Sequence, residues 1–458
     1  MRAVRLHDTR SGAVQPLQPT RWDGEVPHVG IYACGPTVYS RIHIGNARPF
    51  VIFSLLKRFL EHEGYSVDLV INVTDVNDKI YDAARAQGRP SAELAVEMTA
   101  QYQADTSALG IGRPDHEPLA SETIGPIVEH IEALVQRGHA YAVDGDVYFR
   151  VRSDEGYGTL SHRLLDDMDQ GEGVEGVQRK EDPLDFALWK AHKEGEDTKW
   201  DSPWGSGRPG WHIECSAMAE QLLGVGFDVH GGGSDLVFPH HENEAAQTRA
   251  ARGEELTKLW MHNGMIQFTG EKMAKSVGNI ALLGEVIEQY GAETVVMYIV
   301  SGHYRQPLAF SAAALEQAGA NVKRIREATR KLGAGPTAAA ATGETAQLES
   351  IRDAFFDALA NDFNTPHALA QLNEWLALAG RLSASGDEQP REMLGVLGLD
   401  SLLAPVAEAP HDVRELAALR EQARAARDFA ASDRLRDEIA AQGWDVRDGA
   451  DGFELLPR

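Results

Sequence analysis

A strand–helix–strand pattern within residues 29–76 constrains this chain most. VGIYACGPTV (29–38) is a β-rich run that Cys-Gly-Pro ends, and SVDLVINVTDV (66–76) is a second β-rich run. Between them, PFVIFSLLKRFL (49–60) has apolar residues at helical spacing and is followed by a stop signal at Gly64. Two strands joined by a helix over so short a stretch predict an α/β fold with a parallel sheet and a right-handed crossover.

The stretch RIHIGNARPF (41–50) lies where the first predicted strand leads into the helix. Ligands of such sheets bind at the carboxyl ends of strands, and phosphates favour helix N-termini. We therefore predict a nucleotide-phosphate site at His43 and Asn46. The alternative for Asn46 is structural, because asparagine is a favoured N-cap and Pro49 fits a first helical turn. Both roles can hold at once.

A metal site is predicted from four side chains far apart in the sequence. PHHENE (239–244) places a histidine and a glutamate four residues apart, on one face of a helix that its proline begins. Alone, such a pair is usually a solvated helix face. The two cysteines of the chain each follow a β-rich stretch, where strand ends converge; the alternative is two buried thiols that act as small hydrophobes. The predicted tetrahedral zinc shell is Cys34, Cys215, His240 and Glu244. His241 lies one residue off the helix face and is not expected to bind.

Two further segments are compatible with a phosphate ligand. HGGGSDL (230–236) allows close backbone approach, although a lone glycine run is often only a loop. GEKMAKSVGN (270–279) carries Lys272 and Lys275, which bind phosphate or are simply solvated.

Composition limits the classes of function. A chain of 458 residues predicts two to four domains. No apolar run approaches the roughly 18–20 residues that span a bilayer, so no membrane partner is expected. The N-terminus lacks a signal-peptide core, so a cytoplasmic location is the default expectation. The net charge of −25 argues against generic nucleic-acid binding but leaves open a shaped RNA surface with local arginines.

Ordered motifs carry a family resemblance. They are YACGPTVYSRIHIGNARPF, VTDVNDKI, DVYFRV, DFALWK, SPWGSGRPGWHIECSAM, HGGGSDLVFPHHENE, EKMAKSVGN, HYRQPLAFS and NDFNTP. In this order the chain resembles the cysteinyl-tRNA synthetases, which are class I aminoacyl-tRNA synthetases. Each motif alone is weak, whereas the ordered set from about residue 28 to 366 is specific.

The resemblance implies a Rossmann-like catalytic domain with an insertion, a helical bundle and a small C-terminal α/β unit. The expected segments are the first half of the catalytic fold (1–120), a connective insertion (121–205), the second half (206–265), a lysine loop with a stem-contact region (266–332), a linker (333–345), a helical bundle (346–405) and an anticodon-binding unit (411–458).

The resemblance also implies a reaction and its ligands. One zinc ion per chain, at the four residues above, would bind the substrate thiolate, and Mg²⁺ would accompany ATP. His43, Asn46, Lys272 and Lys275 would serve the ATP phosphates. Gly35, Thr74, Trp211, His230 and Asp235 would surround L-cysteine. Otherwise Thr74 is an ordinary strand residue, Trp211 a core aromatic and Asp235 a turn former. The expected partner is tRNA(Cys), and the expected oligomeric state is a monomer.

Two residues depart from the family pattern. Ala274 stands where the lysine loop usually has serine, and Asn46 where a second histidine is usual. Without the serine hydroxyl, one neutral hydrogen bond is lost, which corresponds to a free energy of ~0.5–1.5 kcal/mol. Asparagine supplies no charge but can donate to a phosphoryl oxygen.

The C-terminal unit predicts no specific RNA contact. Arg420, Arg424 and Arg427 would form one basic stripe of a helix, or else a set of intrahelical ion pairs. Trp444 is a candidate for base stacking, although a core position fits it better.

Three functions compete. The first is a cysteine–tRNA ligase. The second is an ATP-dependent ligase that passes activated cysteine to a small amine; the NDFNTP region and residues 411–458 argue against it, because such relatives lack an anticodon-binding tail. The third is an inactive tRNA- or zinc-binding paralogue, which only Asn46 and Ala274 favour.

Overall fold

The computed structural model forms two compact units, Met1–Leu402 and Leu403–Arg458. It describes residues 1–165, 168, 177–268, 281–339, 342–403, 409–449 and 452–457. The segment boundaries expected from the sequence stay predictions. No helix of the described residues is long and apolar enough to cross a membrane.

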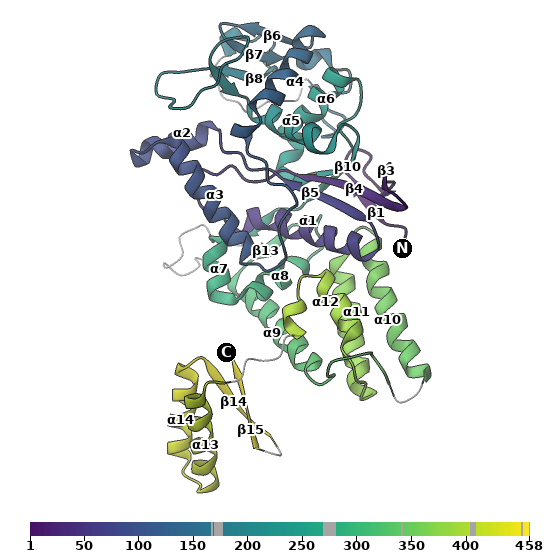
Figure 1. The fold of residues 1–458 in the computed structure, drawn as a ribbon, viewed down its shortest axis with the longest axis vertical. Coiled ribbons are helices and arrows are strands. Elements are labelled where there is room, and N and C mark those ends of the chain that lie inside the picture. Colours follow the sequence, from purple (N-terminus) through teal and green to yellow (C-terminus); the bar gives the residue numbers. More distant parts are fainter. Residues whose placement is uncertain are drawn as a thin grey trace. The chain divides into compact units, whose positions relative to one another are not determined.

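A central sheet of five strands organises the first unit (Figure 1). Its parallel strands are β4 (Val26–Ala33), β5 (Ser66–Ile71), β10 (Phe227–Gly233) and β11 (Thr257–Asn263). β3 (Arg21–Asp23) adds an antiparallel edge to β4. β4 and β5 flank helix α1 (Ile44–His62), so the predicted strand–helix–strand unit and α/β class are confirmed. The parallel strands are buried along almost their whole length because layers cover both faces of the sheet.

The insertion between the two halves of the sheet has its own antiparallel sheet. Its order is β6 (Ala140–Val143), β7 (Asp146–Phe149), β8 (Phe186–Ala191) and β9 (Gly207–Pro209). Helices α4 (Ile124–Gln136), α5 (Trp211–Leu223) and α6 (Glu242–Arg252) share one apolar core with it. Figure 1 shows this layer on one side of the central sheet, with α1 on the other.

The first unit also contains a β-hairpin, two helices after β5 and a set of later helices. β1 (Arg5–Asp8) and β2 (Ala13–Pro16) form a hairpin, and α2 (Asp78–Gln87) and α3 (Ser91–Ser107) follow β5. The later helices are α7 (Leu283–Tyr290), α8 (Ala292–Val300), α9 (Ala312–Thr329), α10 (Thr342–Ala360), α11 (Thr365–Arg381) and α12 (Glu388–Val396). β12 (Ile266–Phe268) pairs in parallel with β13 (Leu308–Phe310). α10 begins inside the expected linker, and Gly335 N–H donates to Asp387 Oδ1 at 3.1 Å.

The second unit is a helical hairpin with a small sheet. It contains α13 (His411–Ala425), α14 (Phe429–Ala441) and the antiparallel strands β14 (Trp444–Gly449) and β15 (Gly452–Pro457). The predicted arginine stripe is wrong. α13 ends at Ala425, Arg420 is only 2% exposed, and Arg427 lies in a turn with a left-handed backbone. Trp444 belongs to the core of this unit, as its core alternative predicted.

Candidate active site

Four buried side chains meet at the carboxyl ends of β4 and β10. Cys34 directly follows β4, and Cys215 lies in α5. His240 lies in the segment that leads into α6, and Glu244 lies in the first turn of α6. Their ligand atoms all lie within 4.8 Å of one another. Glu244 Oε1 is 3.1 Å from His240 Nε2 and 3.6 Å from Cys34 Sγ. The structure thus brings together the four residues that the sequence predicted as a metal shell.

A second set of ligands overlaps the first. Cys34, His230, His241 and Glu244 also have their ligand atoms within 4.8 Å of one another. His241 was placed one residue off the helix face and was not expected to bind, but its Nε2 lies 3.3 Å from Cys34 Sγ. α6 begins only at Glu242, and a kink at Phe238 lies before the two histidines, so spacing on a regular helix does not describe them.

The two thiols have different proton affinities. Burial raises the pKa of Cys34, whereas the hydrogen bond from Cys34 lowers the pKa of Cys215. The pair therefore favours one thiolate beside one thiol. Two cysteine sulfurs, an imidazole and a carboxylate are the donors that zinc takes in tetrahedral sites, so the first set fits this metal.

Further histidines orient the cluster. His230 Nε2 donates to Glu244 Oε2 at 2.8 Å, and His212 and His240 share a hydrogen bond between their Nδ1 atoms at 2.9 Å. His241 Nδ1 lies 2.7 Å from His262 Nε2. Such outer partners fix the ring orientation of metal ligands. The sequence analysis singled out neither His212, which lies three residues before Cys215, nor His262, which lies in no quoted motif.

The N-terminus of α1 differs in detail from the prediction. His43, not Asn46, is the N-cap, and α1 begins at Ile44, so Pro49 lies beyond the first turn. His43 Nδ1 accepts the Gly45 N–H at 3.0 Å, and Asn46 Oδ1 accepts the His43 N–H at 3.2 Å. This is a capping box, which satisfies backbone donors at the start of the helix.

The capping box leaves two donors for a ligand. With Nδ1 of His43 as acceptor, the neutral imidazole carries its proton on Nε2. Burial lowers the pKa of His43, partly opposed by Asp235, so the ring is neutral at pH 7. Asn46 is exposed, and its amide nitrogen donates to no residue that the structure describes. These two uncharged donors thus remain available to an anion, whereas the backbone N–H groups of Ile44, Gly45 and Asn46 already have acceptors within the protein.

Comparisons with known proteins place this geometry in a family. The model of the "tRNA synthetases class I (C) catalytic domain" matches residues 23–320. The chain belongs to the cysteinyl-tRNA synthetase family of class I aminoacyl-tRNA synthetases. It is similar to the cysteine–tRNA ligase of Caldicellulosiruptor saccharolyticus, with 41% identity over 99% of both chains. The cysteine–tRNA ligase of Chromohalobacter salexigens is 45% identical over 93% of this chain and 94% of its own. Membership of this family makes the chain a ligase.

Solved structures agree on the fold of the synthetase. Mycobacterium tuberculosis methionyl-tRNA synthetase in complex with methionyl-adenylate superposes with a TM-score of 0.57 and 17% identity, over 82% of this chain and 89% of that one. An Agrobacterium radiobacter LeuRS in a ternary complex has a TM-score of 0.57 and 13% identity, over 85% of each chain. At such low identity these structures show the shared fold alone.

The residues that the resemblance placed around the amino acid lie near the cluster of the synthetase. Trp211 is 36% exposed, and its ring stacks on His240 with centroids 4.3 Å apart, so it is not a core aromatic. Thr74 is buried and accepts a hydrogen bond from Asn72 at 3.3 Å. A Cβ at Gly35 would lie 1.7 Å from the Asn72 carbonyl oxygen, so only glycine fits there. Asp235 is exposed and influences both His43 and His240 electrostatically.

Lys272, Ala274 and Lys275 lie outside the described residues of the synthetase. The chain on both sides of them is described. β12 ends at Phe268, and Ala281 O accepts the N–H of Ile44 in α1 at 3.0 Å. Ala281 and Leu282 therefore lie beside the N-terminus of α1.

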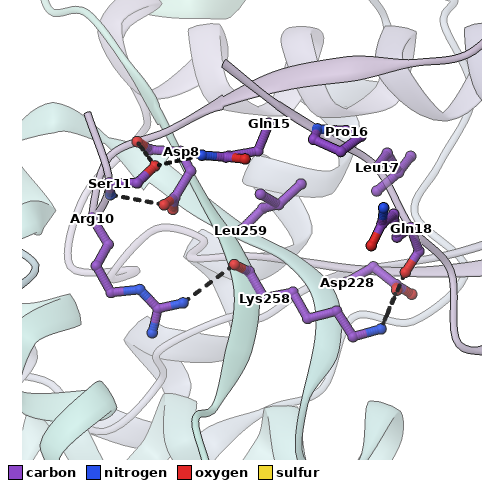
Figure 2. Close-up of a pocket in the computed structure, with 10 residues that line it drawn as sticks. All are labelled: Asp8, Arg10, Ser11, Gln15, Pro16, Leu17, Gln18, Asp228, Lys258 and Leu259. Carbon is purple, nitrogen blue, oxygen red and sulfur yellow. Dashed lines mark hydrogen bonds and ion pairs between the residues drawn. The ribbon is translucent and has the colours of Figure 1, made fainter. Parts of the chain in front are cut away.

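An open pocket of about 420 Å³ lies elsewhere on the synthetase (Figure 2). The β1–β2 hairpin and the first residues of β10 and β11 line it, at the strand ends opposite the cluster. Its acidic and basic groups are already bound within the protein. Lys258 Nζ donates to Asp228 Oδ1 at 3.1 Å, and Asp8 Oδ2 accepts the N–H of Ser11 at 2.8 Å. The pocket is therefore not the candidate active site.

Proposed function

We propose that the protein is a cysteine–tRNA ligase that activates L-cysteine with ATP and transfers it to tRNA(Cys). One observation carries the proposal. The cluster of two cysteines, a histidine and a glutamate lies at the carboxyl edge of a class I synthetase sheet, and the full-length relatives are named cysteine–tRNA ligase.

The first step would form cysteinyl-adenylate. A carboxylate oxygen of cysteine attacks the α-phosphorus of ATP, the bond from that phosphorus to the bridging oxygen breaks, and pyrophosphate leaves. His43 Nε2–H and the Asn46 amide would donate to the phosphoryl oxygens, which the positive end of the α1 dipole would also attract. Lys272 and Lys275 would hold the leaving phosphates. Such transfers depend on in-line positioning and on neutralisation of charge. Mg²⁺ would accompany ATP, held mainly by the phosphates.

The second step would transfer the amino acid. The 2′-hydroxyl of the terminal adenosine of tRNA attacks the carbonyl carbon of the adenylate, and AMP leaves with the bonding electrons. The hydroxyl proton would pass to a phosphate oxygen of the departing AMP. The proposal includes a cytoplasmic location and a monomeric state.

Selection of cysteine would depend on the cluster. Cys34, Cys215, His240 and Glu244 would hold one zinc ion, which would supply a soft Lewis acid for the substrate thiolate. Trp211, Thr74, Gly35, His230 and Asp235 would shape the surrounding site. An apolar pocket separates near-isosteres by only roughly 10–200-fold per methylene. Zinc prefers a thiolate to a serine hydroxyl, so this cluster can discriminate without a separate editing site.

Two other functions would give different results in one experiment. ATP–pyrophosphate exchange is measured with cysteine or with serine, and charging of tRNA is measured afterwards. The proposal expects exchange with cysteine alone, followed by charging. Exchange without charging would favour a ligase for a small amine, and absence of exchange would favour an inactive paralogue.

A further inference from the structure

Arg48 is a buried cation in the second turn of α1. Only 1% of this residue is exposed to solvent. Nη1 donates to the carbonyl oxygen of Gly264 at 2.5 Å, and Nη2 donates to that of His303 at 3.0 Å. Among the described residues no carboxylate pairs with Arg48, and its Nε has no partner. Buried charges are rarely left without a counter-charge, so this positive charge is unusual for the interior of a domain.

The charge lies near the end of α1 that would bind phosphate. Side chains of a helix lean toward its N-terminus, and the first turn of α1 contains no acidic residue. The backbone dipoles already place roughly half a positive charge at this end. Asn46 contributes none, and His43 is neutral. Arg48 is thus the cationic side chain of the first two turns of α1, and an anion bound at the helix N-terminus would compensate it.

One carbonyl group that Arg48 binds, that of Gly264, lies at the carboxyl ends of the parallel strands. Gly264 follows the last residue of β11, Asn263, whose amide donates to the carbonyl oxygen of Gly232 in β10 at 3.3 Å. Gly264 N–H donates to Tyr304 O at 2.8 Å, and a Cβ at residue 264 would lie 2.4 Å from the carbonyl oxygen of Gln306. The turn after β11 is therefore tightly packed, and Arg48 joins it to α1.

We propose that Arg48 is a positioning residue of the ATP site, which fixes the turn at Gly264 against the N-terminus of α1 and supplies the positive charge that Asn46 lacks. The inference rests on the proposed function, because it takes ATP as the ligand of this helix end. Arg48 acts through the backbone and through its field, so it need not touch the nucleotide.

Arg58 provides a matched control on the same helix. It donates to the carbonyl oxygens of Ile111 at 3.2 Å and Gly395 at 2.5 Å, and it also pairs with Asp400 at 3.3 Å. It lies ten residues after Arg48, about 15 Å along the helix. Arg58→Met therefore removes similar contacts at the end of α1 that is far from the proposed ATP site.

The test compares Arg48→Met, Arg48→Lys and Arg58→Met in full-length protein. In ATP–pyrophosphate exchange we expect Arg48→Met to raise the KM for ATP by about tenfold or more, with the KM for cysteine within about twofold. Binding of uncharged adenosine should weaken less than binding of ATP. Arg48→Lys should recover part of the loss, and Arg58→Met should leave the KM for ATP unchanged.

Other results would overturn the inference. A folded Arg48→Met variant with a wild-type KM for ATP would do so, and so would equal weakening of ATP, adenosine and cysteine. If Arg48→Met does not fold, Arg48→Lys decides. Lysine keeps the charge but lacks the planar fork that holds Gly264 and His303, so an unchanged KM for ATP refutes positioning. Wild-type protein without any exchange would instead refute the proposed function.

Discussion

Asn46 accepts a hydrogen bond from the backbone N–H of His43 at 3.2 Å, so its side-chain oxygen completes the cap of α1. The oxygen and the nitrogen of one amide group thus have separate tasks. The oxygen stabilises the helix, and the exposed nitrogen is available to a phosphoryl oxygen.

Substitutions at Asn46 separate these two tasks. Asn46→Ala removes both groups, whereas Asn46→Asp keeps the acceptor for His43 N–H and replaces the donor by a negative oxygen. We expect Asn46→Ala to lower stability by about 0.5–1.5 kcal/mol and Asn46→Asp to preserve it. Both should slow exchange, the aspartate variant by about tenfold or more, because it repels phosphate. Exchange rates measure the effect on activity, and urea denaturation measures the effect on stability. Exchange at the wild-type rate in the aspartate variant would show that Asn46 only caps the helix.

Cys215→Ser tests the metal shell. Serine is a poor zinc ligand, so bound zinc and cysteine affinity should fall together. His241→Asn is the matched comparison, because His241 belongs only to the second possible set. We expect it to retain more zinc than Cys215→Ser, as measured by metal analysis after dialysis against a chelator. Full zinc in the Cys215 variant together with loss in the His241 variant would select the second set instead.

The sequence was sufficient to predict the four residues at the centre of the site, but not the histidines that surround them. The ligand types and the convergence of parallel strand ends were enough to predict Cys34, Cys215, His240 and Glu244 as neighbours. His262 reaches the cluster only through the pairing of β10 with β11, which no local pattern encodes.

Helix ends were predicted less well, for local reasons. α1 begins at Ile44 because a histidine caps it, and histidine is not among the usual N-cap residues. α13 ends before Arg427, a non-glycine residue with a φ of 60°, so neither glycine nor proline marked the turn. The arginine periodicity was therefore counted across the end of a helix.

Trp211 should influence cysteine binding more than stability. It is exposed and stacked on His240, an interaction worth about 0.5–1.5 kcal/mol. We expect Trp211→Ala to raise the KM for cysteine about fivefold or more, Trp211→Phe to raise it less, and the KM for ATP to stay unchanged. Trp22→Ala is the control, because Trp22 is 60% exposed in β3. A wild-type KM for cysteine in Trp211→Ala would exclude a role for this ring in the substrate site.

Glu63, at the C-terminal end of α1, should make the stability of the protein depend on pH. Burial opposes ionisation, but hydrogen bonds from His62 and from Arg2, with the charge of Arg2, lower the pKa of Glu63 from 4.5 to about 2. A lowered folded-state pKa stabilises the protein above the unfolded pKa of about 4.3, and this stability is lost as the pH falls toward 2. After allowance for solvent screening, Glu63→Gln should cost about 1–2 kcal/mol at pH 7. The difference from wild type should narrow by about 0.5 kcal/mol at pH 4. Urea denaturation at both pH values measures it, and a difference independent of pH would show that the carboxylate charge has no part in stability.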